Sequence, residues 1–258
     1  MGSSVVDVGP RLAVVLIALT ALAAVAGRLS GLGQDRPVVI AVVRATVQLA
    51  AVSAVLLVVV GSLLLSTLFV LLMLTVATVT ATGRVTGHAL RSPGALDRLP
   101  PMALPIVGGA APVVALVLAS GAVPLRGVAV IPIAGILIGG AMTATSLAGR
   151  RLRDELHDRR GEVEAALALG LHARDAVLLV GRPVTATALV PVLDQTRTVG
   201  LVTLPGAFVG VLLGGGSPLE AGAAQLLVLV GLLAAQTLAV WTVTELIARG
   251  AILDGVPR

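Results

Sequence analysis

Apolar runs of about 20 residues recur along almost the entire chain, and this feature limits the folds open to it more than any other. An α-helix of that length rises about 30 Å, which matches the hydrocarbon core of a bilayer. The composition agrees, with 57% hydrophobic residues, 12% charged residues and a mean hydropathy of +1.07. Because such runs take up most of the 258 residues, little chain is left for a soluble catalytic domain. The sequence therefore predicts an all-α, polytopic integral membrane bundle, with residues 1–258 as a single transmembrane domain.

Seven of the apolar runs have the length and the low charge of transmembrane helices. An eighth run, residues 176–192, is also apolar, but Arg182 interrupts it and Pro183 and Pro191 break it. We predict that this run forms a membrane-surface or re-entrant helix and does not cross. The seven predicted spans are residues 11–27, 38–60, 63–82, 102–120, 128–148, 198–214 and 221–247.

Positive charge lies in alternate connections between the predicted spans. Arg28 and Arg36 occupy the first connection, further Arg residues occupy the third and fifth, and Arg249 and Arg258 follow the last span. The intervening connections carry only Arg126. Since cytoplasmic loops are enriched in Arg and Lys, we predict an external N-terminus and a cytoplasmic C-terminus in a multi-pass protein of the inner or plasma membrane. The same distribution accounts for the high pI without nucleic acid as a partner.

Residues 150–197 form the one long polar passage, with eight of the eighteen basic and seven of the thirteen acidic residues. The predicted orientation places this passage in the cytoplasm. Within it, Glu164, Ala165 and Ala166 continue a helix, with Ala166 and Leu169 expected on one side, and Gly170 is a natural terminator. A short helix at the end of cytoplasmic extensions has a shape suited to a cleft in a separate motor protein. A merely solvated connector would show the same pattern, so spacing alone leaves both interpretations open.

Few ionisable or amide side chains fall inside the predicted spans. Arg44 and Gln48 stand one helical turn apart and share a face. A charge at this depth faces the bundle or reaches back to the interface, and both options stay open for Arg44. Asp194 and Arg197, three residues apart, are expected to form an ion pair at the membrane boundary. The threonines at positions 75, 78 and 82 are expected to bond back to their own helix.

Helix-breaking and small residues mark further candidate pathway or gating positions, besides Arg44, Gln48, Met142, Asp194 and Arg197. Pro132 and Pro205 remove backbone donors within predicted spans, which is tolerated where protein or water satisfies the freed carbonyls. Gly135 and Gly139 have GxxxG spacing, and the same spacing begins at Gly206. Ordinary close packing of helices explains this spacing, and a symmetric dimer seam or a conduit is the sharper alternative.

Several enzyme classes lack their sequence signatures. The chain contains no Lys, which excludes a G-x-x-x-x-G-K-[ST] nucleotide-binding loop, and it has neither an HExxH nor a G-x-S-x-G motif. His88, His157 and His172 lie in connectors without the spacing of a metal site. We therefore expect a protein that is not an enzyme and that binds no cofactor of its own.

Several short motifs, in order along the chain, resemble the FetB-type permease family. These permeases are the membrane subunits of ABC transporters, and they include bacterial iron exporters and plant aluminium-tolerance proteins. The resemblance covers most of the chain, is strongest from residue 130 to residue 210, and extends to Arg44 and Gln48. The motifs are residues 130–135 (VIPIAG), 139–142 (GGAM), 164–170 (EAALALG), 190–194 (VPVLD), 198–202 (TVGLV) and 204–206 (LPG).

The resemblance implies a permease homodimer that works with two copies of a cytoplasmic ATPase subunit, on which ATP and Mg²⁺ are bound. Glu164, Ala165, Ala166 and Gly170 then belong to the coupling helix that sits on the ATPase. Closure of the ATPases would reach the membrane helices as a rigid-body switch.

This chain departs from the family pattern at three positions. Gly140 stands where the family often has Asn, and Ala207 and Phe208 stand where it often has paired Met. The missing thioethers argue against metal binding at that spot, and Met142 alone is more typical of packing, so we assign no metal ligands. The expected function is export of a metal ion such as iron, or of another small solute. A secondary transporter or channel that needs no ATPase and, less favoured, a membrane-embedded enzyme are the alternatives.

Overall fold

The computed structural model describes residues 9–87 and 97–253, and the chain divides into two compact units, Met1–Gly61 and Ser62–Arg258. The first unit is a helical hairpin of α1 (Pro10–Leu29) and α2 (Asp35–Val59). Its turn contains Gly31 and Gly33, both at positive φ, where a side chain would be strained. Gly27 and Val59 are the only buried residues of the two helices, so most of their apolar side chains remain on the surface, as expected of lipid-facing helices.

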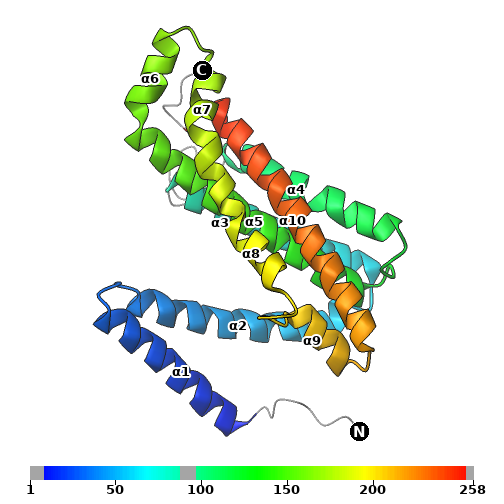
Figure 1. Cartoon of the computed structure of the whole chain (residues 1–258). Helices are drawn as coiled ribbons and strands as arrows, with labels where there is room; N and C mark the ends of the chain where they lie inside the picture. Colours follow the sequence, from blue (N-terminus) through cyan, green and yellow to red (C-terminus); the bar gives the residue numbers. More distant parts are fainter. Residues whose placement is uncertain (1–8, 88–96, 254–258) are drawn as a thin grey trace. The chain divides into compact units, whose positions relative to one another are not determined.

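The second unit is built around α5 (Gly127–Asp158), which contacts α3, α4, α7 and α10 (Figure 1). At 32 residues α5 is about 48 Å long, well beyond the thickness of a hydrocarbon core. The other elements are α3 (Leu63–Thr86), α4 (Leu99–Ala119), α6 (Arg160–Ala168), α7 (Ala173–Ala186), the 3₁₀ turn η1 (Thr187–Leu189), α8 (Val190–Thr198), α9 (Gly206–Leu213) and α10 (Pro218–Ala248).

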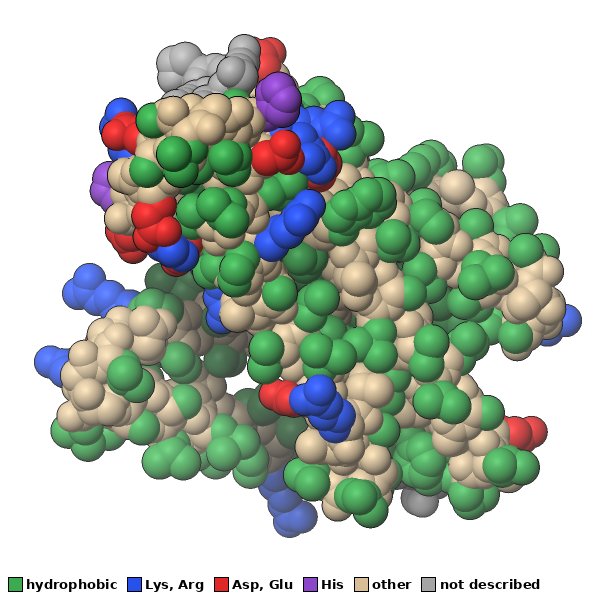
Figure 2. Space-filling model, turned by 45° about the horizontal axis from the view of Figure 1, so that its top comes forward, with side chains coloured by type: hydrophobic (Ala, Val, Ile, Leu, Met, Phe, Trp, Pro, Cys, Tyr) green, Lys and Arg blue, Asp and Glu red, His purple; other side chains and the backbone are tan. Residues whose placement is uncertain are grey.

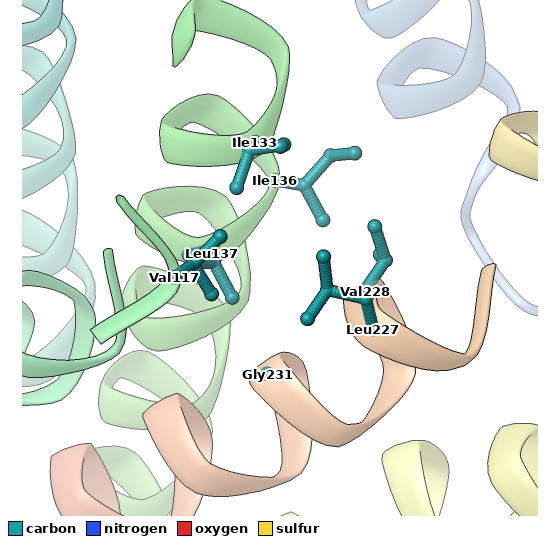
Figure 3. A pocket seen from close by; sticks show the side chains of 7 residues that line it. All are labelled: Val117, Ile133, Ile136, Leu137, Leu227, Val228 and Gly231. Atoms are coloured by element: carbon teal, nitrogen blue, oxygen red, sulfur yellow. The ribbon is translucent and has the colours of Figure 1, made fainter. Parts of the chain in front are cut away.

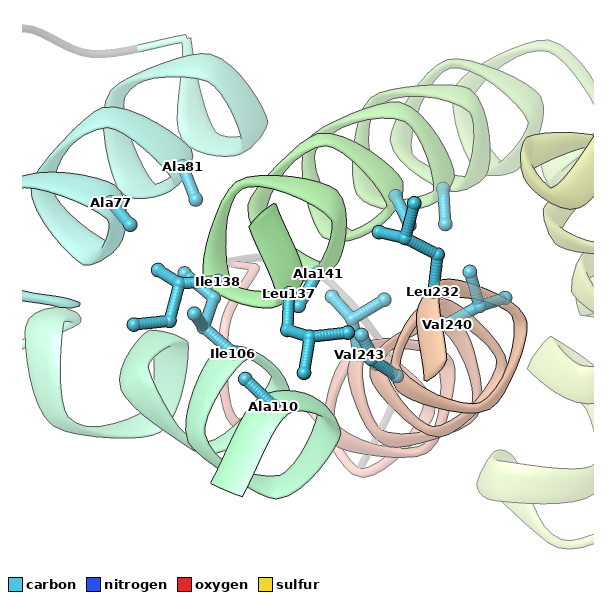
Figure 4. Close-up of a cluster of buried hydrophobic side chains, with 14 of the residues drawn as sticks. Ala77, Ala81, Ile106, Ala110, Leu137, Ile138, Ala141, Leu232, Val240 and Val243 are labelled. Atoms are coloured by element: carbon cyan, nitrogen blue, oxygen red, sulfur yellow. The ribbon is translucent and has the colours of Figure 1, made fainter. Parts of the chain in front are cut away.

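Small residues let the helices around α5 approach closely. Gly109 of α4 makes a close contact with backbone, because a Cβ atom built there would lie 2.5 Å from the carbonyl oxygen of Ala235 in α10. Close backbone approach of this kind is how helices associate where lipid supplies no hydrophobic drive. Figure 4 shows the resulting core, with Ala77 and Ala81 of α3, Ile106 and Ala110 of α4, Leu137, Ile138 and Ala141 of α5, and Leu232, Val240 and Val243 of α10.

Local signals in the sequence explain where several helices begin. Ser62 accepts a hydrogen bond from the amide of Leu65 at the start of α3, and Ser217 with Glu220 forms a capping box at the start of α10. In α3, Thr78 and Thr82 donate to the carbonyl oxygens four residues before them, and Thr75 does the same, which confirms the expectation for these threonines.

The prediction of seven membrane-length helices is confirmed within the described residues, but the identity of the sixth is different. Residues 198–214 do not form a span, because their only helix is α9, which has eight residues and rises about 12 Å. Before α9, the carbonyl of Thr198 accepts from three successive amides, Gly200 has φ +83°, and Pro205 starts the short helix. These turns stop helix formation at the point where the apolar pattern predicted it.

The sixth membrane-length helix is instead Ala173–Thr198, 26 residues long, which contains the run expected to lie on the surface. The prolines do not break it. Pro183 lies inside α7, and Pro191 falls in the first turn of α8, directly after η1. A proline in the first turn of a helix removes a donor that has no partner there, so the chain continues through the 3₁₀ turn.

The close contact at Gly109 generates a stability prediction. Gly109→Ala should lower the free energy of unfolding by roughly 1–3 kcal/mol, because the new methyl group meets backbone that cannot rotate away. Gly222→Ala in α10, where a Cβ atom has no neighbour within 4 Å, is the matched control and should be neutral or slightly stabilising. Thermal unfolding in detergent measures both, and equal midpoints for the two variants would contradict the packing described here.

Candidate functional site

Most of the charged side chains described in the second unit gather at one end of its bundle. The last turns of α5, all of α6 and the first turn of α7 lie at the end where α10 finishes (Figure 1). We call residues 150–175 the polar arm. Figure 2 shows acidic, basic and His side chains clustered over this end, while hydrophobic side chains cover most of the visible remainder. The first charged side chain of α5 after its start is Arg150, so the arm begins about where a membrane-length helix ends.

Helix α6 packs against α7 with one face and exposes the other. Val163 and Ala166 are buried in a cluster with Ala176, Val177 and other residues of α7. Ala166 therefore supports the helix from inside, although the sequence placed it among the docking residues. It does not share a side with Leu169, which is 83% exposed. That expectation was wrong because the helix ends at Ala168, one residue before Leu169.

The outward face of α6 carries charge and small residues. Arg160 Nε donates to Glu164 Oε1 at 2.8 Å, and the two side chains are 80% and 61% exposed. Ala165 and Ala168 are also exposed. Exposed pairs of this kind add little to stability, so this face is free to be used for contact with another molecule.

Both ends of α6 are fixed by hydrogen bonds. At its start Arg159 donates through Nε to Glu162 Oε1 at 2.6 Å and through Nη1 to Glu155 Oε1 at 3.3 Å. This contact holds the pKa of Glu162 below its ordinary value, and the same carboxylate raises the pKa of Arg159. At its end the amide of Leu171 donates to the carbonyl of Ala166 at 3.1 Å, while Gly170 has φ +89°. This is the Schellman arrangement, and it explains why Gly stands at position 170.

An ion cluster joins the polar arm to the C-terminal end of α10. Arg174 donates through Nε and Nη2 to the two carboxylate oxygens of Glu245, at 2.6 and 2.9 Å. Arg249 Nε donates to the same carboxylate at 2.7 Å. The Glu245 side chain is only 17% exposed, so a bidentate contact to it is stronger than the surface pairs of α6. The arm is therefore held to the bundle by directional bonds as well as by apolar packing.

Two further bonds connect the polar end of α5 to its neighbours. Arg153 Nη1 donates to the carbonyl oxygen of Val85 in α3 at 2.8 Å. Arg151 donates to the hydroxyl of Thr187 in η1. Together with the ion cluster, these contacts connect the arm to α3, η1 and α10, so displacement of the arm would be transmitted to the membrane helices.

The structure distributes the predicted pathway residues over several elements and does not bring them into one site. Arg44 and Gln48 are exposed on α2, in the first unit. On α5, Pro132 is exposed, Met142 is half-buried, a Cβ atom at Gly135 would meet the Met73 side chain at 2.8 Å, and Gly139 faces open space. Pro205 and Gly206 begin α9, and Gly206 also has no neighbour within 4 Å of a Cβ position.

The predicted pair between Asp194 and Arg197 is confirmed. Arg197 Nη1 lies 3.6 Å from Asp194 Oδ1, and both side chains are largely exposed on α8. This charged face lies inside a helix of membrane length, where an exposed charge is costly unless it meets water or another protein surface.

Sequence reasoning missed two polar groups that organise the unit. Glu245 is the carboxylate of the ion cluster, and its spacing of four residues from Arg249 was an available signal. Gln225 is buried in α10, and its side-chain oxygen accepts from the amide of Phe208, which attaches α9 to α10. Position alone did not single out Gln225, because its partner Phe208 lies in α9, a short helix in the region that the sequence predicted as a full span.

The residues described contain no cluster of side chains suited to a metal ion. Groups of three or more His, Asp or Glu side chains able to hold one ion are absent from residues 9–87 and 97–253. His157 and His172 are exposed on the arm, and His88 lies outside the described residues. A gap between α4, α5 and α10, lined by apolar side chains, has a volume of about 10 Å³ (Figure 3). That space is at the lower limit for one water molecule, so it is a packing gap and not a transport site.

Comparison with known sequences agrees with the motifs. Residues 11–252 match the family described as "Uncharacterised protein family (UPF0014)". The rice "UPF0014 membrane protein STAR2" is 42% identical over 52% of this chain and 47% of its own length. The Arabidopsis thaliana "Protein ALUMINUM SENSITIVE 3" is 45% identical over 45% of this chain and 42% of its own length. The Escherichia coli "Probable iron export permease protein FetB" is 33% identical over 52% of this chain and 51% of its own length.

The matched regions span about half the length of these curated relatives. No solved structure matches the chain. The family match confirms the resemblance to FetB-type permeases that the motifs indicated.

The ion cluster generates a prediction for the polar arm. Glu245→Gln should lower the free energy of unfolding by about 1–2 kcal/mol, because the guanidinium groups of Arg174 and Arg249 lose the largely buried carboxylate that they share. It should also increase hydrogen–deuterium exchange in residues 160–180. Asp175→Asn, which removes only the exposed neighbour of Arg174, is the matched control and should change stability by less than about 0.5 kcal/mol. Unchanged exchange in the Glu245 variant would show that apolar packing alone holds the arm.

Proposed function

The chain belongs to the UPF0014 family, and from that membership we propose that it is the membrane subunit of an ABC transporter in the inner or plasma membrane. Support comes from the seven membrane-length helices and from relatives whose names describe membrane and permease proteins. In this proposal the chain does not catalyse a reaction, and a separate cytoplasmic ATPase subunit, which binds ATP and Mg²⁺, provides the free energy for transport.

The single observation that carries the proposal is the outward face of α6. A short helix that packs one face on α7 and exposes the other is suited to a cleft in another protein. Arg160 and Glu164 offer charges for orientation, and the exposed Ala165 allows close approach. Because the arm is bonded to α3, η1 and α10, a push on α6 would move these elements as a rigid body.

We assign the transport pathway to a homodimer of this chain. The exposed pair Asp194–Arg197 lies within a membrane-length helix and requires water or protein beside it. Among the residues that the structure describes, none lies within 4 Å of a Cβ position at Gly206 or Gly210 of α9, so a second copy could approach there closely. A polar seam between two copies would let a small hydrated solute pass without a fixed ligand set.

The proposed cargo is a metal ion, with iron as the first choice, or another small solute, and the proposed direction is export. Support comes from the name of the E. coli relative, "Probable iron export permease protein FetB". The name of the Arabidopsis relative, which refers to aluminium sensitivity, also agrees with metal cargo.

The coupling role of α6 leads to a mutational prediction. Glu164→Trp places a large side chain on the exposed face without a clash inside the chain, and it should weaken co-purification with the ATPase about tenfold or more. Transport in vesicles should fall accordingly while the permease remains folded. Leu219→Trp, at an 84% exposed position in the first turn of α10, adds the same bulk at the other end and should leave both unchanged.

Two results would contradict the proposal. Full ATPase binding and full transport by the Glu164 variant would exclude α6 as the coupling helix. ATP-independent transport by the purified chain would favour a secondary transporter or channel instead.

A further inference from the structure

A groove of about 310 Å³ runs between α7 and α10, near the end of the unit that carries the polar arm. Arg174, Leu178 and Arg182 follow one another along α7 at intervals of four residues, so they form one stripe of that helix. The facing stripe of α10 includes Trp241 and Glu245. The remaining lining is apolar or Thr, so the groove is charged toward the arm and mainly apolar along the rest of its length. This groove is separate from the exposed face of α6 and from the Asp194–Arg197 pair.

The positions of three residues indicate how deep in the membrane the groove lies. Trp241 stands about 34 Å along α10 from Pro218, just beyond the thickness of a hydrocarbon core. It is the only Trp of the chain and is 66% exposed. Tryptophan is enriched at the level of lipid headgroups. On α5, Arg150 lies about 34 Å from the helix start. Its neighbour Arg151 donates to the hydroxyl of Thr187, which stands between the groove residues Ala186 and Leu189. The charged part of the groove therefore lies at headgroup level.

The charges in the groove do not balance. Arg174 and Arg249 share the carboxylate of Glu245, and Asp175 pairs with Arg174. Within the described parts of the chain, the guanidinium of Arg182 makes no hydrogen bond or ion pair. A planar guanidinium with free donors at headgroup level is suited to two oxygens of a phosphate.

We propose that this groove is a binding site for an anionic phospholipid. The phosphate contacts Arg182, with Arg174 adding positive charge beside it, and an acyl chain lies along Leu189, Val240 and the face of Trp241. Basic pockets between membrane helices bind anionic headgroups in this way. A bound lipid would bridge α7 and α10, the two helices that the ion cluster joins, and would so tie the polar arm to the membrane surface.

The single Trp allows a direct test, which does not depend on the orientation or on the proposed transport function. The protein is placed in two preparations of phosphatidylcholine nanodiscs. One contains phosphatidylglycerol with brominated acyl chains, and the other contains brominated phosphatidylcholine at the same mole fraction. Bromine quenches tryptophan fluorescence on contact. We expect the brominated phosphatidylglycerol to be enriched about fivefold at Trp241, as one unpaired basic side chain at the surface predicts.

Arg182→Gln should remove this selectivity, and Arg126→Gln, a change of the same kind at the opposite end of α5, should retain it. Should the Arg182 variant not fold, competition in the natural chain decides: unbrominated phosphatidylglycerol relieves the quenching and unbrominated phosphatidylcholine does not. Equal quenching by both brominated lipids would overturn the proposal, as would selectivity that survives in the Arg182 variant. Absence of quenching by either lipid would also overturn it, since a protein surface such as a second copy would then cover Trp241.

Discussion

The thickness of the bilayer determines where this chain can carry charge, and the rest of the structure follows from that limit. A helix that crosses needs about 20 apolar residues, yet α5 has 32 and Ala173–Thr198 has 26. The surplus of α5 and the first turns of α7 therefore extend beyond the hydrocarbon, and the charges of residues 150–175 are located on that surplus. α6 connects the two extensions and so occupies the end of an arm that protrudes from the membrane body.

A protruding arm transmits force only if it is attached firmly to the helices that move. Apolar burial of Val163 and Ala166 attaches α6 to α7, and the carboxylate of Glu245 attaches α7 to α10 through Arg174. The first contact is non-directional and the second fixes orientation, so together they restrict both separation and rotation of the arm. Within the bundle, Gly109 brings α4 against the backbone of α10, which leaves these helices little freedom to deform independently.

Most of the fold could be predicted from the sequence because membrane spans depend on length and hydropathy. Six of the seven predicted spans correspond to observed membrane-length helices. The polar segment, predicted as residues 150–197, is shorter than expected, because residues 173–198 form the sixth membrane-length helix. The error came from counting apolar residues without backbone conformation: residues 198–214 are apolar, but Gly200 and Pro205 turn the chain and leave only eight residues of helix. The prolines of residues 173–198 caused the opposite error. They predicted a break in the helix, whereas Pro191 lies in the first turn of α8 and does not break it. The exposed positions Glu164 and Ala165 could be proposed from a motif. The burial of Ala166 depends on tertiary packing, and Arg174 and Glu245 are 71 residues apart in sequence, so neither contact could be predicted from local pattern.

In the orientation that we propose, the polar arm faces the cytoplasm and the start of α10 faces the other side of the membrane. Because the chain contains no Cys, single-cysteine variants at Glu164 and Leu219 report these two ends without background. Intact cells would be treated with a membrane-impermeant maleimide, and permeabilised cells would serve as the reference. The account predicts that the cysteine at position 219 is labelled in intact cells and the cysteine at position 164 only after permeabilisation. Labelling of position 164 in intact cells would contradict it.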